Sequence, residues 1–466
     1  MGRSRIEVDL PLQLDRADSA SLPSQIVGEL RKAIGRGVLI AGDTMPSSRA
    51  LAKSLRLSRG SVVAAYEQLA AEGYLEATRG GGTRVSTQLE DLHPTLAQAM
   101  PEKRAQQKVG GSPSLSLLPG IPFESSLQEA PWRAAWRSGA KLLDELDLPE
   151  VLAEHLRHLR SVVVSPQNIM VTSGARDGLA TVLHTFRYLK GRPAKVGFES
   201  PGNRHLRTVV RLLGHEVVAV PIDDEGVMVR ALEGLDLDLL VVTPSHQYPA
   251  GASMSASRRF AVLEWARTRR VVVVEDDYDS LLRHVSAPLP ALASLDDPAD
   301  PHVILLGTFS TLLTPRMSAG WLSAPKPLFQ KMAKVRSGLG NPVSSITAQA
   351  LAAYVSSGEL ARHTRRMRRL YKARSKTLRE SLERVPGVRI LAQASGLNAA
   401  LTTSSYPEGA LVSRCEEAGL RVRGLHDYWG EASWHVGLMV GVGALKEEEF
   451  QIAVDRLVQA CSPRPK

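Results

Sequence analysis

The sequence predicts a multidomain protein in which a small N-terminal winged helix-turn-helix precedes a large α/β domain with a mainly parallel sheet. Two observations lead to this fold class. Residues 21–86 give the order helix, helix, turn, helix, hairpin, and residues 129–466 alternate helical patterns with short Val/Ile/Leu runs such as 271-VVVVEDD-277. Near-continuous apolar strands separated by helices are typical of a parallel sheet covered on both faces.

The composition is that of an ordinary globular protein. The 466 residues, 43% hydrophobic and 23% charged, are enough for several domains. No apolar run approaches the roughly 18 residues of a membrane helix, and residues 1–20, an N-terminal tail, lack the apolar core of a signal peptide. Cys415 and Cys461 are too few for a disulfide framework or a thiolate metal site. We therefore expect a cytoplasmic protein with no metal site and no membrane partner.

Hydrophobic spacing and helix caps define the elements of residues 21–86. Ile26, Leu30 and Ile34 recur at helical spacing and predict a first helix. A second helix is expected over 49–55, and Ser58 is placed to cap a third helix that reaches residue 72. Two short strands, 74–77 and 83–85, flank the glycine-rich run 79-RGGG-82 and complete a wing.

Basic side chains gather where such a fold meets DNA. The net charge is +10, and residues 20–86 hold nine Lys/Arg against five Asp/Glu. A recognition helix enters the major groove with its N-terminus first, so the start of the third helix is expected to face phosphates or base edges. Taken singly, such bases are solvated helix-end charges, but their joint placement favours DNA. The candidate contacts are Arg49, Ser58, Arg59, Ser61 and Arg79.

The run 23-PSQIVGELRKAIGRGVLIAGDTMPSSRALAKSLRLSRGSVVAAYEQLAAEGYL-75, followed by RGGGTRV, resembles the DNA-binding domain of the GntR family of bacterial transcription regulators. The resemblance implies that Arg49 and Arg59 are the main phosphate and base contacts and that Gly81 forms the wing tip. Val63 stands where the family often carries a third base.

Residues 87–128 are polar and rich in Pro, Gly and Ser, which indicates a linker. Its length would let the DNA-binding domain of one chain reach over a partner subunit.

Polar motifs follow the predicted strands of the large domain, at the sheet edge where ligands bind in such folds. These motifs resemble those of the fold-type I aminotransferases over about 330 residues. Joined to a GntR-like domain, this is the arrangement of the MocR subfamily of regulators. The motifs are 172-TSGARDGL-179, 199-ESPGNRH-205, 243-TPSHQYPAG-251, 274-VEDDYDS-280 and 307-GTFSTLLTPRMSAGW-321.

The resemblance implies pyridoxal phosphate as cofactor, held by a Schiff base to a lysine. That lysine follows the GTFS run, where this chain has Thr311, and no lysine occurs between Lys195 and Lys326. Ser318 replaces the arginine that clamps the phosphate, with Arg316 nearby, and Asn203 replaces the aromatic that stacks on the ring. The family's tyrosine segment before the first strand, and its carboxylate-binding arginine within 424–450, are also missing. If the cofactor binds, we expect it to bind non-covalently.

Several elements of the family's pocket are retained. Asp276 would pair with the pyridine nitrogen, and Tyr278 and His246 would face the ring substituents. Residues 173–175 at a helix N-terminus form a candidate anion cradle. Asp276 is equally explained as a strand-end carboxylate that caps a helix or pairs with an arginine. The expected pocket comprises Ser173, Gly174, Ala175, Asn203, His246, Asp276, Tyr278, Ser310, Thr311 and Arg316.

The segment 361-ARHTRRMRRLYKARSKT-377 carries eight Lys/Arg and no acid on a helical pattern. It is either a second DNA-facing surface or a solvated helix face, and the pattern alone favours the solvated face.

We therefore expect a transcription regulator that is not an enzyme and acts as a homodimer on a double-stranded operator with paired half-sites. The resemblance implies a head-to-tail dimer, and the large domain would sense an unidentified small-molecule effector. Two alternatives stay open. One is a pyridoxal phosphate-dependent aminotransferase fused to a DNA-binding domain, and the other is a regulator whose large domain only dimerises.

Overall fold

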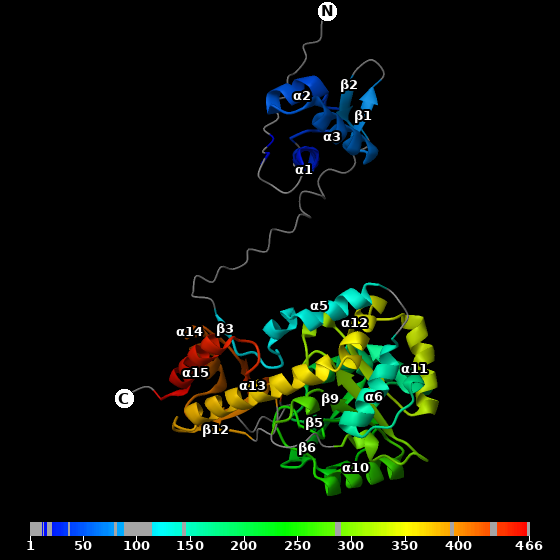
Figure 1. The fold of residues 1–466 in the computed structure, drawn as a ribbon, viewed down its shortest axis with the longest axis vertical. Helices are drawn as coiled ribbons and strands as arrows, with labels where there is room; N and C mark the ends of the chain where they lie inside the picture. The colour runs from blue at the N-terminus through cyan, green and yellow to red at the C-terminus, as the bar shows by residue number, and fades with distance from the viewer. Residues whose placement is uncertain are drawn as a thin grey trace, which may run out of the picture. The chain divides into compact units, whose positions relative to one another are not determined.

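The computed structural model describes residues 12, 14–15, 21–35, 38–78, 82–87, 114–141, 146–284, 290–391, 396–428 and 436–463. The chain divides after residue 110 into two compact units, which are described separately (Figure 1). Among the described residues, no helix has the length and apolar character needed to cross a bilayer. Nor does this part of the chain contain a His/Cys/Asp/Glu group able to hold a metal ion.

The first unit is the winged helix-turn-helix that the sequence predicts. Its helices are α1 (Leu22–Gly35), α2 (Ser48–Leu55) and α3 (Arg59–Ala71), and its antiparallel wing pairs β1 (Leu75–Thr78) with β2 (Gly82–Val85). Ile26, Leu30 and Leu69 are fully buried and hold the three helices together. Arg79 and Gly81, which the sequence predicts on the wing, lie outside the described residues.

Serine caps fix the starts of α2 and α3. The Ser47 hydroxyl accepts from the Ala50 amide at 3.2 Å, and the Ser58 hydroxyl accepts from the Ser61 amide at the same distance. Arg56, in the left-handed region at φ 54°, makes the turn between the two helices. The caps satisfy amides that have no intrahelical acceptor, so both helices begin where the sequence predicts.

The second unit begins earlier than the sequence indicates. The predicted linker, 87–128, is wrong from residue 115 onward, because β3 (Leu115–Ser116) pairs in parallel with β14 (Leu420–Arg421). Leu117 is 1% exposed in the core of this unit, and the 3-10 helix η2 (Glu124–Gln128) follows. The segment is polar on average, but its alternating leucines form a strand whose partner lies about 300 residues away, so local composition concealed it.

An eight-stranded sheet dominates the second unit, in the order β4-β11-β10-β9-β8-β5-β6-β7. Neighbours are parallel from β10 through β6, whereas β11 and β7 run antiparallel. The prediction of a mainly parallel sheet is thus confirmed. The sequence did not predict the antiparallel strand β11 between β4 and β10. The strands are β4 (Ile169–Thr172), β5 (Lys195–Ser200), β6 (Glu216–Asp223), β7 (Gly226–Val227), β8 (Leu239–Val242), β9 (Val272–Asp277), β10 (Val303–Thr308) and β11 (Gly320–Ser323).

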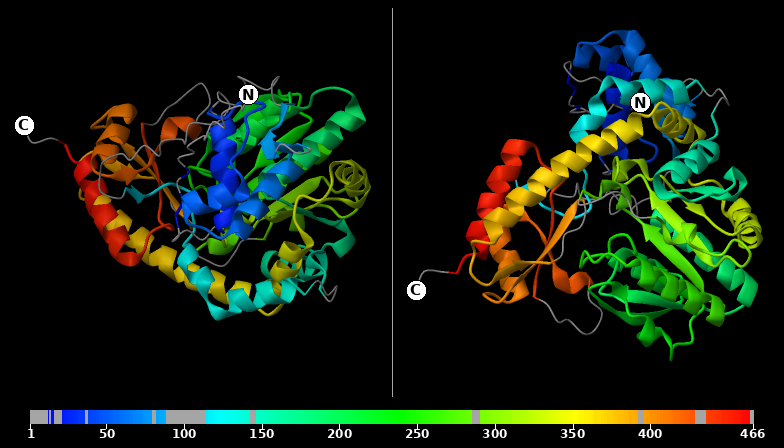
Figure 2. Two further views of the ribbon diagram at one scale, coloured as in Figure 1. Left: turned by 90° about the horizontal axis from the view of Figure 1, so that it is seen from above. Right: turned by 60° about the horizontal axis from the view of Figure 1, so that its bottom comes forward.

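Helices cover both faces of this sheet, as parallel strands require (Figures 1 and 2). One face packs against α7 (Ala175–Lys190), α8 (Arg204–Leu212) and α11 (Lys326–Leu339). Over the other face lie α6 (Leu148–Arg160), α9 (Val229–Leu232) and α10 (Ala256–Arg269), with α5 (Ala130–Gly139) and α12 (Ser345–Ser356) beyond. The strands are therefore buried, and the sheet's carboxyl edge is left for polar side chains.

A smaller sheet forms the C-terminal part, in the order β12 (Val388–Ile390), β13 (Asn398–Thr403), β16 (Gly437–Gly441), β15 (Arg423–Gly424). It packs with α14 (Glu408–Glu417) and α15 (Glu447–Cys461). The long helix α13 (Glu359–Leu382) runs along the outside of the unit toward this sheet (Figures 1 and 2).

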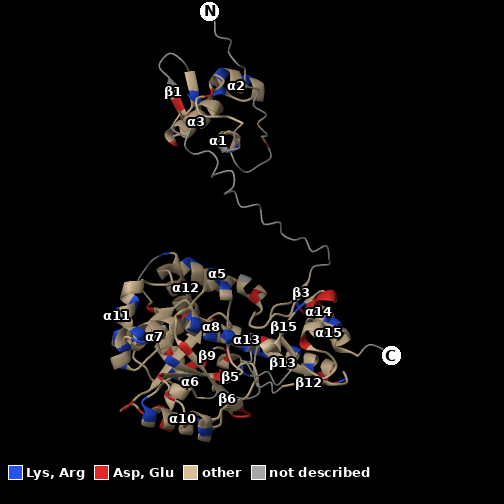
Figure 3. Cartoon of the chain, turned by 180° about the vertical axis from the view of Figure 1, so that it is seen from behind, with Lys and Arg blue, Asp and Glu red and all other residues tan. Residues whose placement is uncertain are grey.

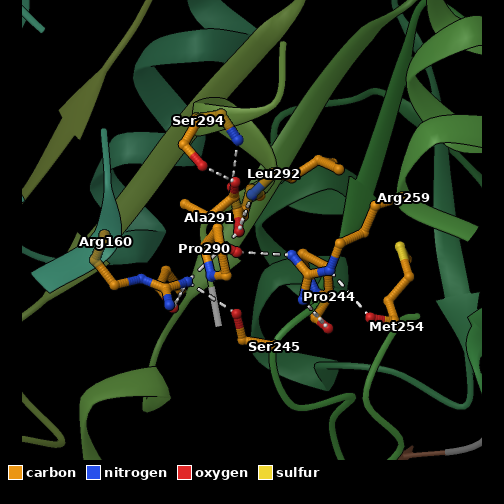
Figure 4. A network of polar contacts seen from close by, with 12 residues as sticks. Arg160, Pro244, Ser245, Met254, Arg259, Pro290, Ala291, Leu292 and Ser294 are labelled. Carbon is orange, nitrogen blue, oxygen red and sulfur yellow. Dashed lines mark hydrogen bonds and ion pairs between the residues drawn. The ribbon is translucent and has the colours of Figure 1, made fainter. Parts of the chain in front are cut away.

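A buried charge network supports the end of β9 (Figure 4). Arg160, 1% exposed, donates to Asp277 at 2.8 Å and to the Ser245 hydroxyl at 2.9 Å. Glu275 accepts from the amides of Leu292 and Ala293, each at 3.0 Å. Side chains alternate along a strand, so this network holds both neighbours of Asp276 on one face of the sheet and leaves Asp276 for the other.

Candidate functional site

A cavity of about 560 Å³ lies at the carboxyl ends of several parallel strands of the large sheet. This is the edge at which ligands bind in open α/β sheets. Eight of the ten predicted pocket residues line it, and His246 and Arg316 do not. The eight are Ser173, Gly174, Ala175, Asn203, Asp276, Tyr278, Ser310 and Thr311.

The N-terminus of α7 forms one end of the cavity. Gly174 adopts φ 111°, a conformation that favours glycine, and turns the chain from β4 into α7. The Ser173 amide donates to Asp177 at 3.0 Å, while the first-turn amides of a helix generally lack acceptors of their own. Arg176 also lines the cavity. This end therefore suits a negatively charged group.

Asp276, on β9, and Asn203, at the start of α8, both line the cavity and are hydrogen-bonded to each other. Asn203 caps α8 with its side-chain oxygen, which accepts from the His205 amide at 3.1 Å, and its nitrogen donates to Oδ2 of Asp276 at 3.3 Å. Asp276 is 3% exposed, and its Oδ1 has no hydrogen-bond partner among the described residues. Burial raises the pKa of Asp276 to about 7. A buried oxygen without a partner, on a residue that lines a cavity, is a candidate acceptor for a ligand donor.

Tyr278 lines the cavity, and its hydroxyl is hydrogen-bonded to the buried His246. Its hydroxyl is 2.9 Å from Nδ1 of His246, which is itself 2.8 Å from Oδ2 of Asp279. His246 is 5% exposed and stacks on the Tyr278 ring with centroids 5.9 Å apart. His246 is thus a buried support of Tyr278, which corrects the expectation that it lines the pocket.

Arg316 does not occupy the place of the missing phosphate-clamping arginine. Its side chain is 84% exposed and pairs with Glu124 at 3.2 Å. The 3-10 turn η6 (Pro315–Met317) that carries Arg316 is followed by Ser318, which does line the cavity. The prediction for Arg316 is therefore wrong, because the turn directs its side chain outward to an acid in the segment that was assigned to the linker.

Further cavity residues come from segments that sequence reasoning did not include. Residues 118–121 line it, although they fell within the predicted linker. Arg423 also lines the cavity, one residue before 424–450, where the resemblance implied a carboxylate-binding arginine. Tyr248 and Tyr428 meet edge to face at 5.4 Å and add an aromatic wall. Only the Tyr248 motif carried a sequence signal, since it lies directly after the fourth predicted strand.

The residues present do not fit a covalently held pyridoxal phosphate. Thr311, which the resemblance places at the Schiff-base position, donates its hydroxyl to the carbonyl of Tyr278. No lysine occurs among the described residues that line the cavity. Ser318 offers no charge to a phosphate. The α7 end and the free oxygen of Asp276 do fit the two polar ends of a ligand of that size, held without a covalent bond.

The predicted DNA-facing side chains lie together at the starts of α2 and α3. Arg49, Ser58 and Arg59 are exposed, and Ser61 is partly buried because its amide and hydroxyl contact the Ser58 hydroxyl. Bases on α2 are visible in Figure 3. Arg84, on β2, pairs with Glu76 across the wing at 2.5 Å. The N-termini of two adjacent helices thus present two exposed guanidiniums on one unit.

Comparison with known proteins defines the class of protein. Residues 22–85 match the gntR family of bacterial regulatory proteins, and residues 134–422 match aminotransferase class I and II. The Pyrococcus horikoshii kynurenine aminotransferase shares the fold of 80% of this chain and 97% of its own, with a TM-score of 0.67 at 23% identity. The chain is therefore a DNA-binding regulator that carries an aminotransferase-like domain, a domain family that normally binds pyridoxal phosphate.

Full-length relatives define the family. The chain is 40% identical over 461 residues to the HTH-type pyridoxine biosynthesis transcriptional regulator PdxR of Corynebacterium glutamicum, covering 97% of this chain and 99% of the relative. It is 30% identical to the probable rhizopine catabolism regulatory protein MocR of Rhizobium meliloti, with 78% of each chain covered. The chain belongs to the MocR-type regulators of the gntR family. This confirms the resemblance, and such regulators bind DNA and are typically homodimers.

Proposed function

We propose that this regulator binds a small anionic effector non-covalently in the cavity of its large unit, and that it has no transaminase activity. The observation that carries the proposal is the contrast within the cavity. Asp276 keeps a buried oxygen without a partner among the described residues, while Thr311 stands where the resemblance implies the Schiff-base lysine. Without a Schiff base, the chain lacks the electron sink that amino-group transfer requires.

Pyridoxal phosphate or a related phosphorylated pyridine is the first effector to test. The α7 end suits the phosphate, and Asp276 suits a ring N–H donor at the opposite end. The name of the Corynebacterium glutamicum relative, which regulates pyridoxine biosynthesis, supports the same class of ligand. Arg423 supplies a further positive charge for a carboxylate or phosphate.

At the DNA, we propose that Arg49, Arg59 and Ser58 contact phosphates and base edges, with Arg79 and Gly81 on the wing. Two copies in a head-to-tail dimer would read paired half-sites of one operator. An effector would then act by favouring one arrangement of the two units, to the extent that its affinity differs between arrangements.

The test is a titration of the full chain with pyridoxal phosphate, followed by melting temperature and visible absorbance. We expect the melting temperature to rise with ligand concentration, as mass action requires, with no band that borohydride traps. A trapped band in the unchanged chain would show that a lysine reaches the cofactor, and an unchanged melting temperature would exclude pyridoxal phosphate as the ligand.

Two variants place the binding event in the cavity. Thr311→Lys returns an amine to the Schiff-base position and should produce a borohydride-trappable band. Arg176→Ala should weaken the melting shift, whereas the exposed Arg187→Ala, on the same helix, should not. Two results together would contradict binding at this site. They are an unchanged melting shift in Arg176→Ala and the absence of a borohydride-trappable band in Thr311→Lys.

A further inference from the structure

Helix α13 has two faces of opposite character. Leu360, Met367, Tyr371 and Leu378 are at most 4% exposed and pack into the main core of the second unit. The remaining surface is strongly basic, because residues 360–379 contain nine Lys/Arg and no Asp or Glu. The helix lies on the outside of the unit (Figures 1 and 2).

Three of the nine bases are structural. Arg374 is 1% exposed and donates to the carbonyls of Val442 at 2.9 Å and Leu445 at 2.7 Å. Arg366 pairs with Glu129 at 3.0 Å, and Arg368 donates to a backbone carbonyl at 2.8 Å. These contacts tie α13 to its neighbours and account for three of the nine charges. Arg379, which is partly buried, pairs with Glu383.

The exposed bases form a single stripe, which we call the α13 stripe. It consists of Arg362, Arg365, Arg369, Lys372 and Lys376, all exposed and spaced by three or four residues. This spacing places them in one row on the face opposite the buried residues. Arg362 and Lys376, at the two ends, pair with acids of their own helix.

The centre of the stripe is unneutralised. Arg365, Arg369 and Lys372 make no hydrogen bond or ion pair with any residue that the structure describes. Like charges three or four residues apart destabilise a helix, and solvated helices usually intersperse acids to avoid this. An uninterrupted basic row on a helix that is otherwise well packed is what a polyanion-binding surface requires.

We propose that the α13 stripe binds the phosphate backbone of double-stranded DNA, as a second contact surface beside the winged helix. The 14 residues between its ends rise about 21 Å along the helix axis. A duplex rises roughly 3.4 Å along its axis for each phosphate of one strand, so the stripe is as long as about six base pairs. The stripe has no amide or aromatic side chain at its centre, so the contact follows the backbone and carries no sequence information.

Another part of the same chain already binds DNA, which makes DNA the expected partner of the α13 stripe. The winged helix-turn-helix of the same chain holds duplex DNA, so any further basic surface of the chain meets that DNA at a high effective concentration. An acidic protein partner would need its own docking contacts, and the stripe shows no apolar anchor of the kind that protein interfaces use. The inference is independent of the effector proposed for the cavity.

The test measures binding of the full chain to a 60-bp duplex of mixed sequence over a range of salt concentrations. The variant Arg365→Gln/Arg369→Gln/Lys372→Gln should bind about tenfold more weakly near 0.1 M salt. The slope of log K against log salt should fall by roughly 2 to 3, since each lost phosphate contact removes about 0.9.

The matched control removes the same number of exposed charges elsewhere on the unit, in Lys190→Gln/Arg230→Gln/Lys331→Gln. It should leave the salt slope unchanged. Equal behaviour of the two variants would overturn the proposal, since it would show only the effect of net charge. Melting temperatures check that both are folded, and the single change Arg369→Gln, expected to lower the slope by about 0.9, replaces the triple variant if that one unfolds.

Discussion

The two units of this protein differ in whether their charged side chains are buried or exposed. In the winged-helix unit, the core cluster contains only apolar residues and Tyr66, and Ser86 is the one buried polar residue among those described. Its ion pairs, such as Arg31–Glu72, lie at the surface. The large unit instead buries many charged side chains, namely Arg160, Glu199, Arg207, Arg259, Glu275, Asp276, Asp279, Arg336 and Arg374.

The difference follows from where each unit meets its ligand. DNA is read by exposed side chains on helix ends, so the winged-helix unit needs only an apolar core to hold those ends in place. A small ligand is held inside the large unit, where buried polar groups must be fixed by other buried polar groups. Because burying a charge is costly unless it is paired, such groups are expected only where geometry depends on them.

The largest effect is expected at the Arg160 network. Arg160→Met leaves Asp277 and Glu275 buried without their shared cation, which should destabilise the large unit by about 3–5 kcal/mol. Denaturant unfolding followed by tryptophan fluorescence would measure this, since all the tryptophans lie in the large unit. The control is Arg31→Ala, which breaks an exposed pair of the winged-helix unit and should have little effect. Its unfolding is followed by far-UV circular dichroism, because that unit has no tryptophan. Similar losses in both variants would remove the contrast between the units.

A smaller, pH-dependent effect is expected at Asp276. Burial raises its folded-state pKa to about 7, above its unfolded value of 3.8, so between these values the folded state binds the proton more tightly. Its contribution to stability therefore falls as pH rises from about 4 to about 7. Asp276→Asn should raise the melting temperature at pH 8 and change it less at pH 5.

The exposed Asp224→Asn provides the control for that series and should show no such trend. Glu199 is also buried, and burial raises its pKa to about 7. If the melting temperature of Asp276→Asn still depends on pH, the variant Glu199→Gln tests whether Glu199 causes the remaining dependence. A gain in melting temperature that is equal at pH 5 and pH 8 would contradict the raised pKa of Asp276.

In the winged-helix unit, function and stability are expected to separate. Arg59→Ala removes an exposed guanidinium at the start of α3 and should weaken operator binding by about 1–3 kcal/mol with no loss of melting temperature. The operator is first selected from random duplexes with the unchanged chain. Normal binding by Arg59→Ala would show that Arg59 is only a solvated helix-end charge.

The smallest effect is expected at the serine caps. Ser58→Ala and Ser47→Ala each remove one cap and should each cost about 1 kcal/mol of stability. Only Ser58→Ala is expected to weaken DNA binding further, because Ser58 lies at the start of the recognition helix. Binding assays at a temperature where both variants are fully folded would separate the two roles. Equal binding by the two variants would assign Ser58 to capping alone.

The sequence by itself determined the winged helix-turn-helix and the parallel strands of the large unit. Both depend on local patterns. The Ser58 hydroxyl caps α3 by accepting from the amide three residues later in the chain. A buried strand such as β8 is apolar along its whole length whatever it packs against. For the same reason the sequence indicated eight residues that line the cavity, because each lies at or shortly after the end of a strand, or at the start of a helix.

Tertiary structure alone decided the rest, because it depended on contacts between distant segments. Leu115 belongs to the large unit and not to the linker, because it pairs with Leu420. Residues 118–121, which follow it, line the cavity. The side chain of Arg316 points outward and pairs with Glu124. On α13, Arg374 is buried whereas Arg369 is exposed. Helical spacing gives the relative directions of side chains, but only packing against the core shows which direction is inward.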